Sequence, residues 1–228
     1  MNHVVQAGAS DLTGLTATVD GLAVALLAIA LLSVAARRLS VAIWLLVAQA
    51  LVLAATAGAI AIGTGAVHAL IATVLTLIIK GIVLPVVLFR VLHGVRIRRE
   101  VELVLPTQVA MLLAVCVVFV AYQATGAIRL PGAVPSHHAL PVAVALMLIG
   151  LGLMIGRRKA LSQVAGLIIM ENGVYLAALI ATTGLPLAVE LGVAFDLLIA
   201  VLLLGVFAYR INETFDTINT DRLGSLRG

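Results

Sequence analysis

Long runs of apolar residues, separated by short polar segments, follow one another along the whole chain. A helix needs about 20 predominantly apolar residues to cross the hydrocarbon core of a bilayer. The runs do not alternate apolar with polar positions, as the strands of a membrane barrel do, and an open strand would leave unpaired backbone groups in lipid. The pattern therefore predicts seven transmembrane helices, over 11–36, 40–63, 66–91, 105–125, 139–156, 160–183 and 186–209.

The composition supports lipid as the solvent of this chain. Of its 228 residues, 63% are hydrophobic and 11% are charged, whereas a soluble domain is about half apolar and a quarter charged. The net charge of +4 does not indicate a nucleic-acid-binding surface, because the basic residues form short clusters between the apolar runs. We therefore predict an all-α integral membrane protein, and expect the first run to be a retained helix because no basic n-region precedes it.

The basic residues also predict the topology. Twelve of the 14 Lys and Arg residues follow the odd-numbered runs, whereas Arg129 follows an even-numbered run and Lys80 lies inside the third run. Cytoplasmic connections carry an excess of Lys and Arg. We therefore expect the N-terminus outside and the C-terminus, with the polar tail 210–228, in the cytoplasm. The twelve residues are Arg37, Arg38, Arg90, Arg96, Arg98, Arg99, Arg157, Arg158, Lys159, Arg210, Arg222 and Arg227.

The connection 126–138 is the longest on the predicted outer side, and it contains two glycines and two prolines. Such residues are typical of loops between structured units. We expect it to separate an N-terminal four-helix portion, 1–125, from a three-helix module, 139–228.

Five ionisable residues lie inside the apolar runs: Asp20, Lys80, Glu171, Glu190 and Asp196. An ionised side chain at the centre of a transmembrane helix costs at least ~2.5–3.5 kcal/mol, so such residues usually have a function. Lys80, Glu171 and Asp196 lie close to the centres of their runs, and we expect them near the membrane midplane. Asp20 and Glu190 lie nearer the outer ends.

Neutral residues add to this polar group. Gln49 lies at a similar depth in the second run, and Tyr175 follows Glu171 by one helical turn, within reach of a hydrogen bond. Pro85 has no backbone N–H and clashes with the carbonyl one turn earlier. We therefore expect a loosened turn beside Lys80.

Two interpretations of the buried charges remain open. Lys80 either forms a permanent ion pair that fixes helix packing, or belongs to a relay with Glu171 and Asp196. One lysine cannot neutralise two acids, and a surplus buried carboxylate becomes able to exchange protons. We favour a relay for protons, with Na⁺ as the less favoured ion. The chain has one cysteine and scattered histidines, so we expect no metal, no cofactor and no catalytic residues.

The C-terminal part resembles known membrane subunits. The stretch LMLIGLGLMIGRRKALSQVAGLIIMENGVYL (146–176) resembles the first two helices of the K subunit of respiratory NADH dehydrogenase. It is also similar to the C subunit of multisubunit Na⁺/H⁺ antiporters, and the stretch 195–228 resembles the last helix and tail of those proteins. The whole chain most resembles component E of hydrogenase-4-type complexes. In that family the MENG segment, an acid in the ELGVAFD segment and a lysine in an apolar third helix recur in this order.

The resemblance implies a non-catalytic membrane subunit of a complex I-related assembly in a bacterial or archaeal cytoplasmic membrane. Its partners would be antiporter-like and H-subunit-like membrane subunits and a peripheral redox arm. Asp196 occupies the position of the third-helix glutamate of the K subunit. The second-helix acid of that subunit falls at Ile168, one turn before Glu171, and this departure fits component E better than the respiratory subunit.

Two other functions remain open from the sequence. One is a subunit of a redox-independent cation/proton antiporter, which would purify with membrane proteins and without a redox arm. The other is a structural scaffold, in which neutralising Lys80 would damage assembly more than ion coupling.

Overall fold

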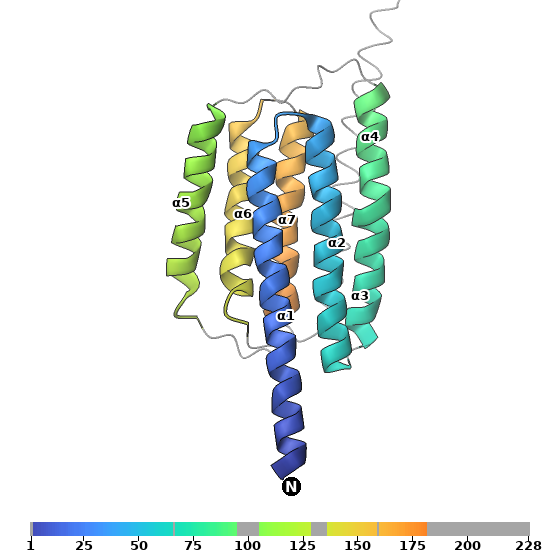
Figure 1. Cartoon of the computed structure of the whole chain (residues 1–228). Helices are drawn as coiled ribbons and strands as arrows, with labels where there is room; N and C mark the ends of the chain where they lie inside the picture. Colours follow the sequence, from blue (N-terminus) through green and yellow to red (C-terminus); the bar gives the residue numbers. More distant parts are fainter. Residues whose placement is uncertain (1, 66, 95–104, 129–135, 159, 182–228) are drawn as a thin grey trace, which may run out of the picture.

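The computed structural model describes residues 2–65, 67–94, 105–128, 136–158 and 160–181, which form a bundle of roughly parallel and antiparallel helices (Figure 1). Six spans in this part are long and apolar enough to cross a bilayer. This finding confirms the predicted all-α membrane fold. The helices are α1 (Asn2–Ala35), α2 (Leu39–Thr64), α3 (Val67–Ile78), a π-helical segment η1 (Ile79–Val83), α4 (Leu84–Gly94), α5 (Thr107–Thr125), α6 (Ala139–Gly156) and α7 (Ala160–Ala181).

The predicted helix boundaries agree with the structure to within a few residues, with two exceptions. The first helix begins at Asn2, well before the apolar run, and its start extends beyond the rest of the bundle (Figure 1). The third predicted helix consists of α3, η1 and α4, which together contain the span Thr73–Arg90. The seventh predicted helix, 186–209, and the tail 210–228 lie outside the described residues, so the count of seven stays a prediction.

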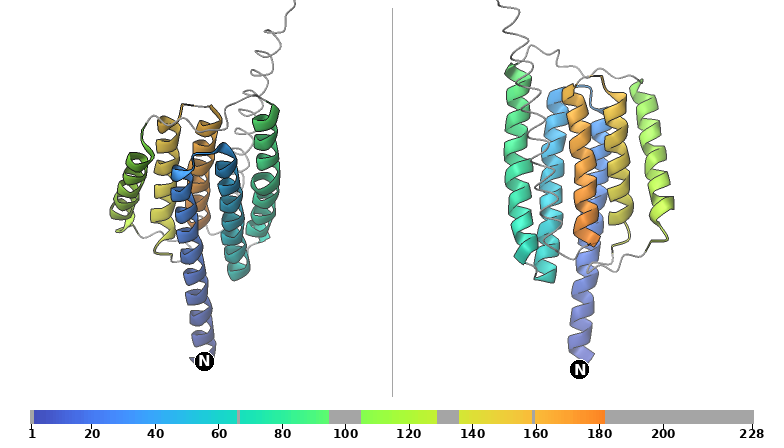
Figure 2. Two further views of the ribbon diagram at one scale, coloured as in Figure 1. Left: turned by 45° about the horizontal axis from the view of Figure 1, so that its top comes forward. Right: turned by 180° about the vertical axis from the view of Figure 1, so that it is seen from behind.

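Four helices form the centre of the bundle. The contacts run from α1 to α2, from α2 to α7, from α7 to α6 and from α6 back to α1. The segments α3, η1 and α4 pack on the outside of α2, and α5 packs on α6 and α1 at the opposite edge (Figure 2). The two predicted portions, 1–125 and 139–228, therefore touch each other over a broad area within the described part, where α1 and α2 face α6 and α7.

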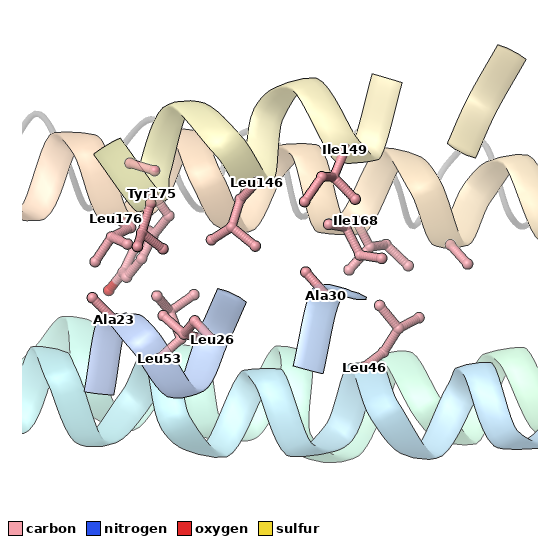
Figure 3. Close-up of a cluster of buried hydrophobic side chains, with 14 of the residues drawn as sticks. Ala23, Leu26, Ala30, Leu46, Leu53, Leu146, Ile149, Ile168, Tyr175 and Leu176 are labelled. Carbon is pink, nitrogen blue, oxygen red and sulfur yellow. The ribbon is translucent and has the colours of Figure 1, made fainter. Parts of the chain in front are cut away.

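Apolar side chains from all four central helices meet in the interior. Leu26 of α1 and Leu53 of α2 face Leu146 of α6 and Leu176 of α7, and all four are fully buried (Figure 3). Lipid is as apolar as these side chains, so close packing stabilises helix association in a membrane more than exclusion of water does.

The closest helix contact in the bundle is between α6 and α7, and glycines make it possible. A Cβ atom added at Gly166 would lie 2.8 Å from the Gly150 carbonyl oxygen, and one at Gly173 would lie 2.6 Å from the Ala143 carbonyl oxygen. Real Cβ atoms do not approach backbone atoms so closely. Small residues of this kind let two transmembrane helices approach backbone to backbone. The contact therefore fixes how α7 is placed against the rest of the bundle.

Apart from Lys80, the basic residues that the structure describes gather at one end of the bundle. Arg37 and Arg38 connect α1 to α2, and Arg157 follows α6 at the same end, where it contacts the carbonyl of Ser33. The start of α6 lies at the opposite end, beside Asp20 of α1. This arrangement fits the predicted alternation of basic and non-basic connections. The side of the membrane on which each end lies stays a prediction.

Candidate functional site

A π-helical turn presents Lys80 to the interior of the bundle. The N–H of Leu84 donates to the carbonyl of Ile79, five residues earlier, so η1 contains one residue more than an α-helical turn. Pro85 follows directly and supplies no N–H, which explains why the regular pattern of hydrogen bonds is interrupted here. The loosened turn predicted from Pro85 is this segment. Segments of this kind are frequent at functional sites in helical proteins.

Lys80 forms an ion pair with Glu171 of α7. The Nζ atom lies 2.6 Å from Glu171 Oε1, and each side chain is only 2% exposed. Glu171 lies in the middle of the apolar span Ser162–Ala181, and Lys80 lies near the middle of Thr73–Arg90. The pair is therefore inside the protein at the level of the hydrocarbon core. Of the two acids proposed as partners of Lys80, Glu171 makes the contact that the structure describes.

Amide side chains extend the polar group to a third helix. The Lys80 ammonium also donates a hydrogen bond of 2.9 Å to Asn172 Oδ1, and Asn172 Nδ2 donates to Gln49 Oε1 of α2 at 3.1 Å. Gln49 and Asn172 are almost completely buried. Among the described residues, Gln49 Nε2 has no hydrogen-bond partner. The chain of contacts joins η1, α7 and α2 in an apolar surrounding.

The aromatic ring of Tyr175 lies beside the same ammonium group. Its centroid is 5.4 Å from Lys80 Nζ, within the range of a cation–π interaction. The Tyr175 hydroxyl accepts a hydrogen bond of 3.1 Å from Thr76 of α3. The sequence predicted that Tyr175 is within reach of a hydrogen bond to Glu171. The structure places its ring beside Lys80 and its hydroxyl on Thr76 of α3, and the predicted bond to Glu171 stays a prediction.

Among the described residues one cation meets one anion at this site, and the burial of both has a cost. A buried ion pair is stable only when its geometry is good and further hydrogen bonds satisfy the remaining polar atoms. Asn172 and the Tyr175 ring supply such contacts to the Lys80 ammonium. Removing either charge would leave the other without its counter-charge in a nonpolar interior.

Comparison with known proteins identifies relatives of the chain. The uncharacterized protein Rv0085 of Mycobacterium tuberculosis is 34% identical over 164 residues, which cover 70% of this chain and 74% of that protein. The chain belongs to the same family as Rv0085. Hydrogenase-4 component E from Escherichia coli K12 and from Shigella flexneri are each 32% identical over 123 residues, or 54% of this chain and 56% of the relative. No family model and no solved structure matches the chain.

The chain thus spans about half the length of the component E relatives that it matches, 56% in each case. This similarity supports the predicted relationship to the hydrogenase-4 component E family. The predicted resemblance to the respiratory K subunit and to the antiporter C subunit is not directly tested by these relatives and stays a prediction.

Asp20 of α1 lies away from the ion pair, beside the start of α6. Its Oδ1 atom accepts a hydrogen bond from the Ser136 hydroxyl and one of 3.0 Å from the His138 N–H, and the Ser136 hydroxyl in turn accepts from the Ala139 N–H at 2.9 Å. The first N–H groups of a helix have no partner within the helix, and the helix dipole favours a negative charge there. This geometry makes Asp20 a cap that joins α1 to α6.

The remaining predicted residues cannot be placed. Asp196, the third member of the predicted relay, and Glu190 lie outside the described residues. Among residues that the structure does describe, no group of three or more His, Cys, Asp or Glu side chains gathers where it could hold a metal ion.

Two residues of the site were not predicted from the sequence. Asn172, which follows Glu171 directly, accepts a hydrogen bond from Lys80. Thr76, one helical turn before Lys80, donates to the Tyr175 hydroxyl. A neutral polar residue one position or one turn from a buried charge is the signal that points to them. It is a weak signal, because single Asn and Thr residues also occur in membrane helices as packing residues.

Proposed function

We propose that this chain is a non-catalytic membrane subunit of a hydrogenase-4-type complex related to respiratory complex I, in the cytoplasmic membrane of its cell. Redox reactions in a peripheral arm would drive proton translocation through the membrane subunits. The similarity to hydrogenase-4 component E supports the assignment to such a complex. The main support for a role in translocation is the buried contact between Lys80 and Glu171 in the middle of the apolar spans.

In this proposal Glu171 and Asp196 bind protons alternately, and Lys80 is the counter-charge that moves between them. A buried carboxylate that loses its counter-charge holds a proton more tightly, and it releases the proton when the counter-charge returns. The π-helical turn beside Lys80 suits such a role, because its hydrogen bonds are less regular than those of an α-helix. Glu190 would lie toward the outer half of the path.

Substitutions of the two acids test the relay. Glu171→Gln keeps an oxygen that accepts a hydrogen bond from Lys80, and Asp196→Asn is equally conservative, so we expect the complex to assemble. Each variant should lower the number of protons translocated per turnover of the whole complex in proteoliposomes. Asp20→Asn is the matched control, because it makes the same change at a helix cap. The relay is refuted if both acid variants translocate protons normally.

A structural scaffold is the second candidate function, and the direct 2.6 Å contact between Lys80 and Glu171 favours it. A permanent pair would need no partner beyond Glu171. Lys80→Met separates the two functions when the amount of assembled complex and the translocation per assembled complex are measured side by side. A scaffold predicts less complex with normal translocation in the remainder, whereas a relay predicts reduced translocation in every complex that assembles.

A further inference from the structure

A cavity of about 100 Å³ lies between α5 and α6. These two helices stand side by side at one edge of the bundle (Figures 1 and 2). Its walls are almost entirely apolar, and they include Leu113 and Val117 of α5 and Leu148 of α6. Leu113 and Leu148 are exposed, so the cavity opens at the outer face of the bundle as a groove. Gly152 also lines it, and a Cβ atom added there would meet no atom within 4 Å.

Arg157 forms one end of this groove, directly after the last residue of α6. Its side chain is only 2% exposed, and its Nη2 atom donates to the Ser33 carbonyl at 2.6 Å. In the part of the chain that the structure describes, Arg157 Nε has no hydrogen-bond partner, and no carboxylate forms an ion pair with the guanidinium. Burial lowers the pKa of Arg157 to about 10, so the group stays charged near neutral pH.

A buried guanidinium without a counter-ion is costly, and it therefore favours the binding of an anion. Arginine matches phosphate in particular, because its planar group donates two parallel hydrogen bonds. The position of Arg157 at the end of an apolar span is the level at which lipid headgroups lie. Arg37, Arg38 and Arg158 are exposed at the same end and add to the positive potential there.

We propose that the groove between α5 and α6 holds an acyl chain of an anionic phospholipid, and that Arg157 binds its phosphate group. The apolar walls and the cation belong to one continuous cavity, which matches a molecule with a long apolar chain and an anionic end. A free phosphate ion would use Arg157 alone and leave the apolar groove unfilled. The site therefore selects a lipid by charge and by chain together.

Native mass spectrometry of the full chain in mild detergent tests the site, with phosphatidylglycerol and phosphatidylcholine of identical acyl chains as probes. We expect the chain to retain phosphatidylglycerol preferentially. Arg157→Gln should reduce this retention about tenfold, the loss that follows from removing one charge-assisted hydrogen bond. The control Arg158→Gln changes the neighbouring exposed arginine and should leave the preference intact.

A second variant tests the groove without changing the charge, in case Arg157→Gln impairs folding. Gly152→Leu fills the open space along α6 and should weaken retention of both lipids. Gly21→Leu is its control, because a Cβ atom there also meets no atom within 4 Å and Gly21 does not line the groove.

Four results would overturn the proposal. Equal retention of phosphatidylglycerol by the unsubstituted chain and by Arg157→Gln would exclude Arg157 as the phosphate site. Displacement of the lipid by inorganic phosphate alone would indicate an anion site without an acyl chain. Unchanged retention in Gly152→Leu would mean that the groove holds no acyl chain. A lack of any lipid preference in the unsubstituted chain would exclude selection of the lipid by charge.

Discussion

Lys80 and Asn172, which are 92 residues apart in the chain, are joined by a hydrogen bond of 2.9 Å from the ammonium group to the side-chain oxygen. The same amide donates through its nitrogen to Gln49, so its orientation is fixed from both sides. An amide used in this way connects a charged group to a neutral one without adding a charge of its own. The ion pair between Lys80 and Glu171 is thus held by a neighbour that cannot titrate.

Replacing Gln49 with leucine should destabilise the protein, because Asn172 Nδ2 would lose its acceptor in a buried site. A buried polar group without a partner costs about 1–3 kcal/mol. We expect Gln49→Leu to lower the midpoint of thermal unfolding in mild detergent. The control is Gln123→Leu on the exposed face of α5, which should change the midpoint little. Equal midpoints for the two variants would mean that the amide contacts add no stability.

A double substitution should reveal how strongly the two buried charges depend on each other. Lys80→Met and Glu171→Leu each leave one charge unpaired, and breaking a buried pair in this way typically costs about 3–5 kcal/mol. The variant with both substitutions removes the described pair without leaving either of its charges alone, so we expect it to be more stable than either single variant. The measurement is a thermal unfolding series of the four proteins. Strictly additive losses would contradict a direct pair.

Adding one methyl group between α6 and α7 should destabilise the bundle. Gly166→Ala would place Cβ 2.8 Å from the Gly150 carbonyl oxygen, so the helices would have to move apart. Overpacking of this kind costs about 1–3 kcal/mol. Gly152→Ala is the control, because the same methyl group meets open space there and alanine is the better helix former. Unfolding midpoints should fall for Gly166→Ala and stay level or rise for Gly152→Ala.

Asp20→Ala should weaken the junction between α1 and α6 while leaving ion translocation per turnover unchanged. The start of α6 would lose its capping carboxylate, at a cost of about 1 kcal/mol. The unfolding midpoint in detergent and the proton count in proteoliposomes check the two halves of this prediction. A strong loss of translocation in an assembled complex would show that Asp20 belongs to the ion path instead.

Six of the seven predicted helices lie in the described part of the chain, and the structure confirms all six as spans. They could be predicted because length and apolarity determine whether a segment can cross a bilayer. The sequence also predicted that Lys80 and Glu171 lie at similar depth, since depth follows from position along a helix. It could not show that Glu171 contacts Lys80. That contact depends on how each helix is rotated, and the extra residue in the π-helical turn changes the rotation of everything that follows it.

Asp20 shows a second limit of prediction from sequence. Its place in an apolar run made it one of five ionisable residues expected inside the membrane, nearer the outer end than Lys80. Its actual partner is Ser136, 116 residues later, in a segment that returns to α1 after α5. Such a contact depends on the path of a connection, and the periodicity of a helix contains no information about it. The partner in the close contact of α6 with α7 could not be predicted from sequence either. A glycine in a transmembrane helix indicates close packing but not which helix packs against it.

The separation of Lys80 from its partner residues along the chain also matters while the protein is being made. The ribosome completes the span around Lys80 long before it reaches α7, so the lysine enters the membrane before its counter-charge exists. An isolated lysine at that depth costs at least ~2.5–3.5 kcal/mol. The third span therefore gains from staying beside the insertion machinery until Glu171 is synthesised. The ion pair described for the finished bundle thus gives the order in which its helices can be released into lipid.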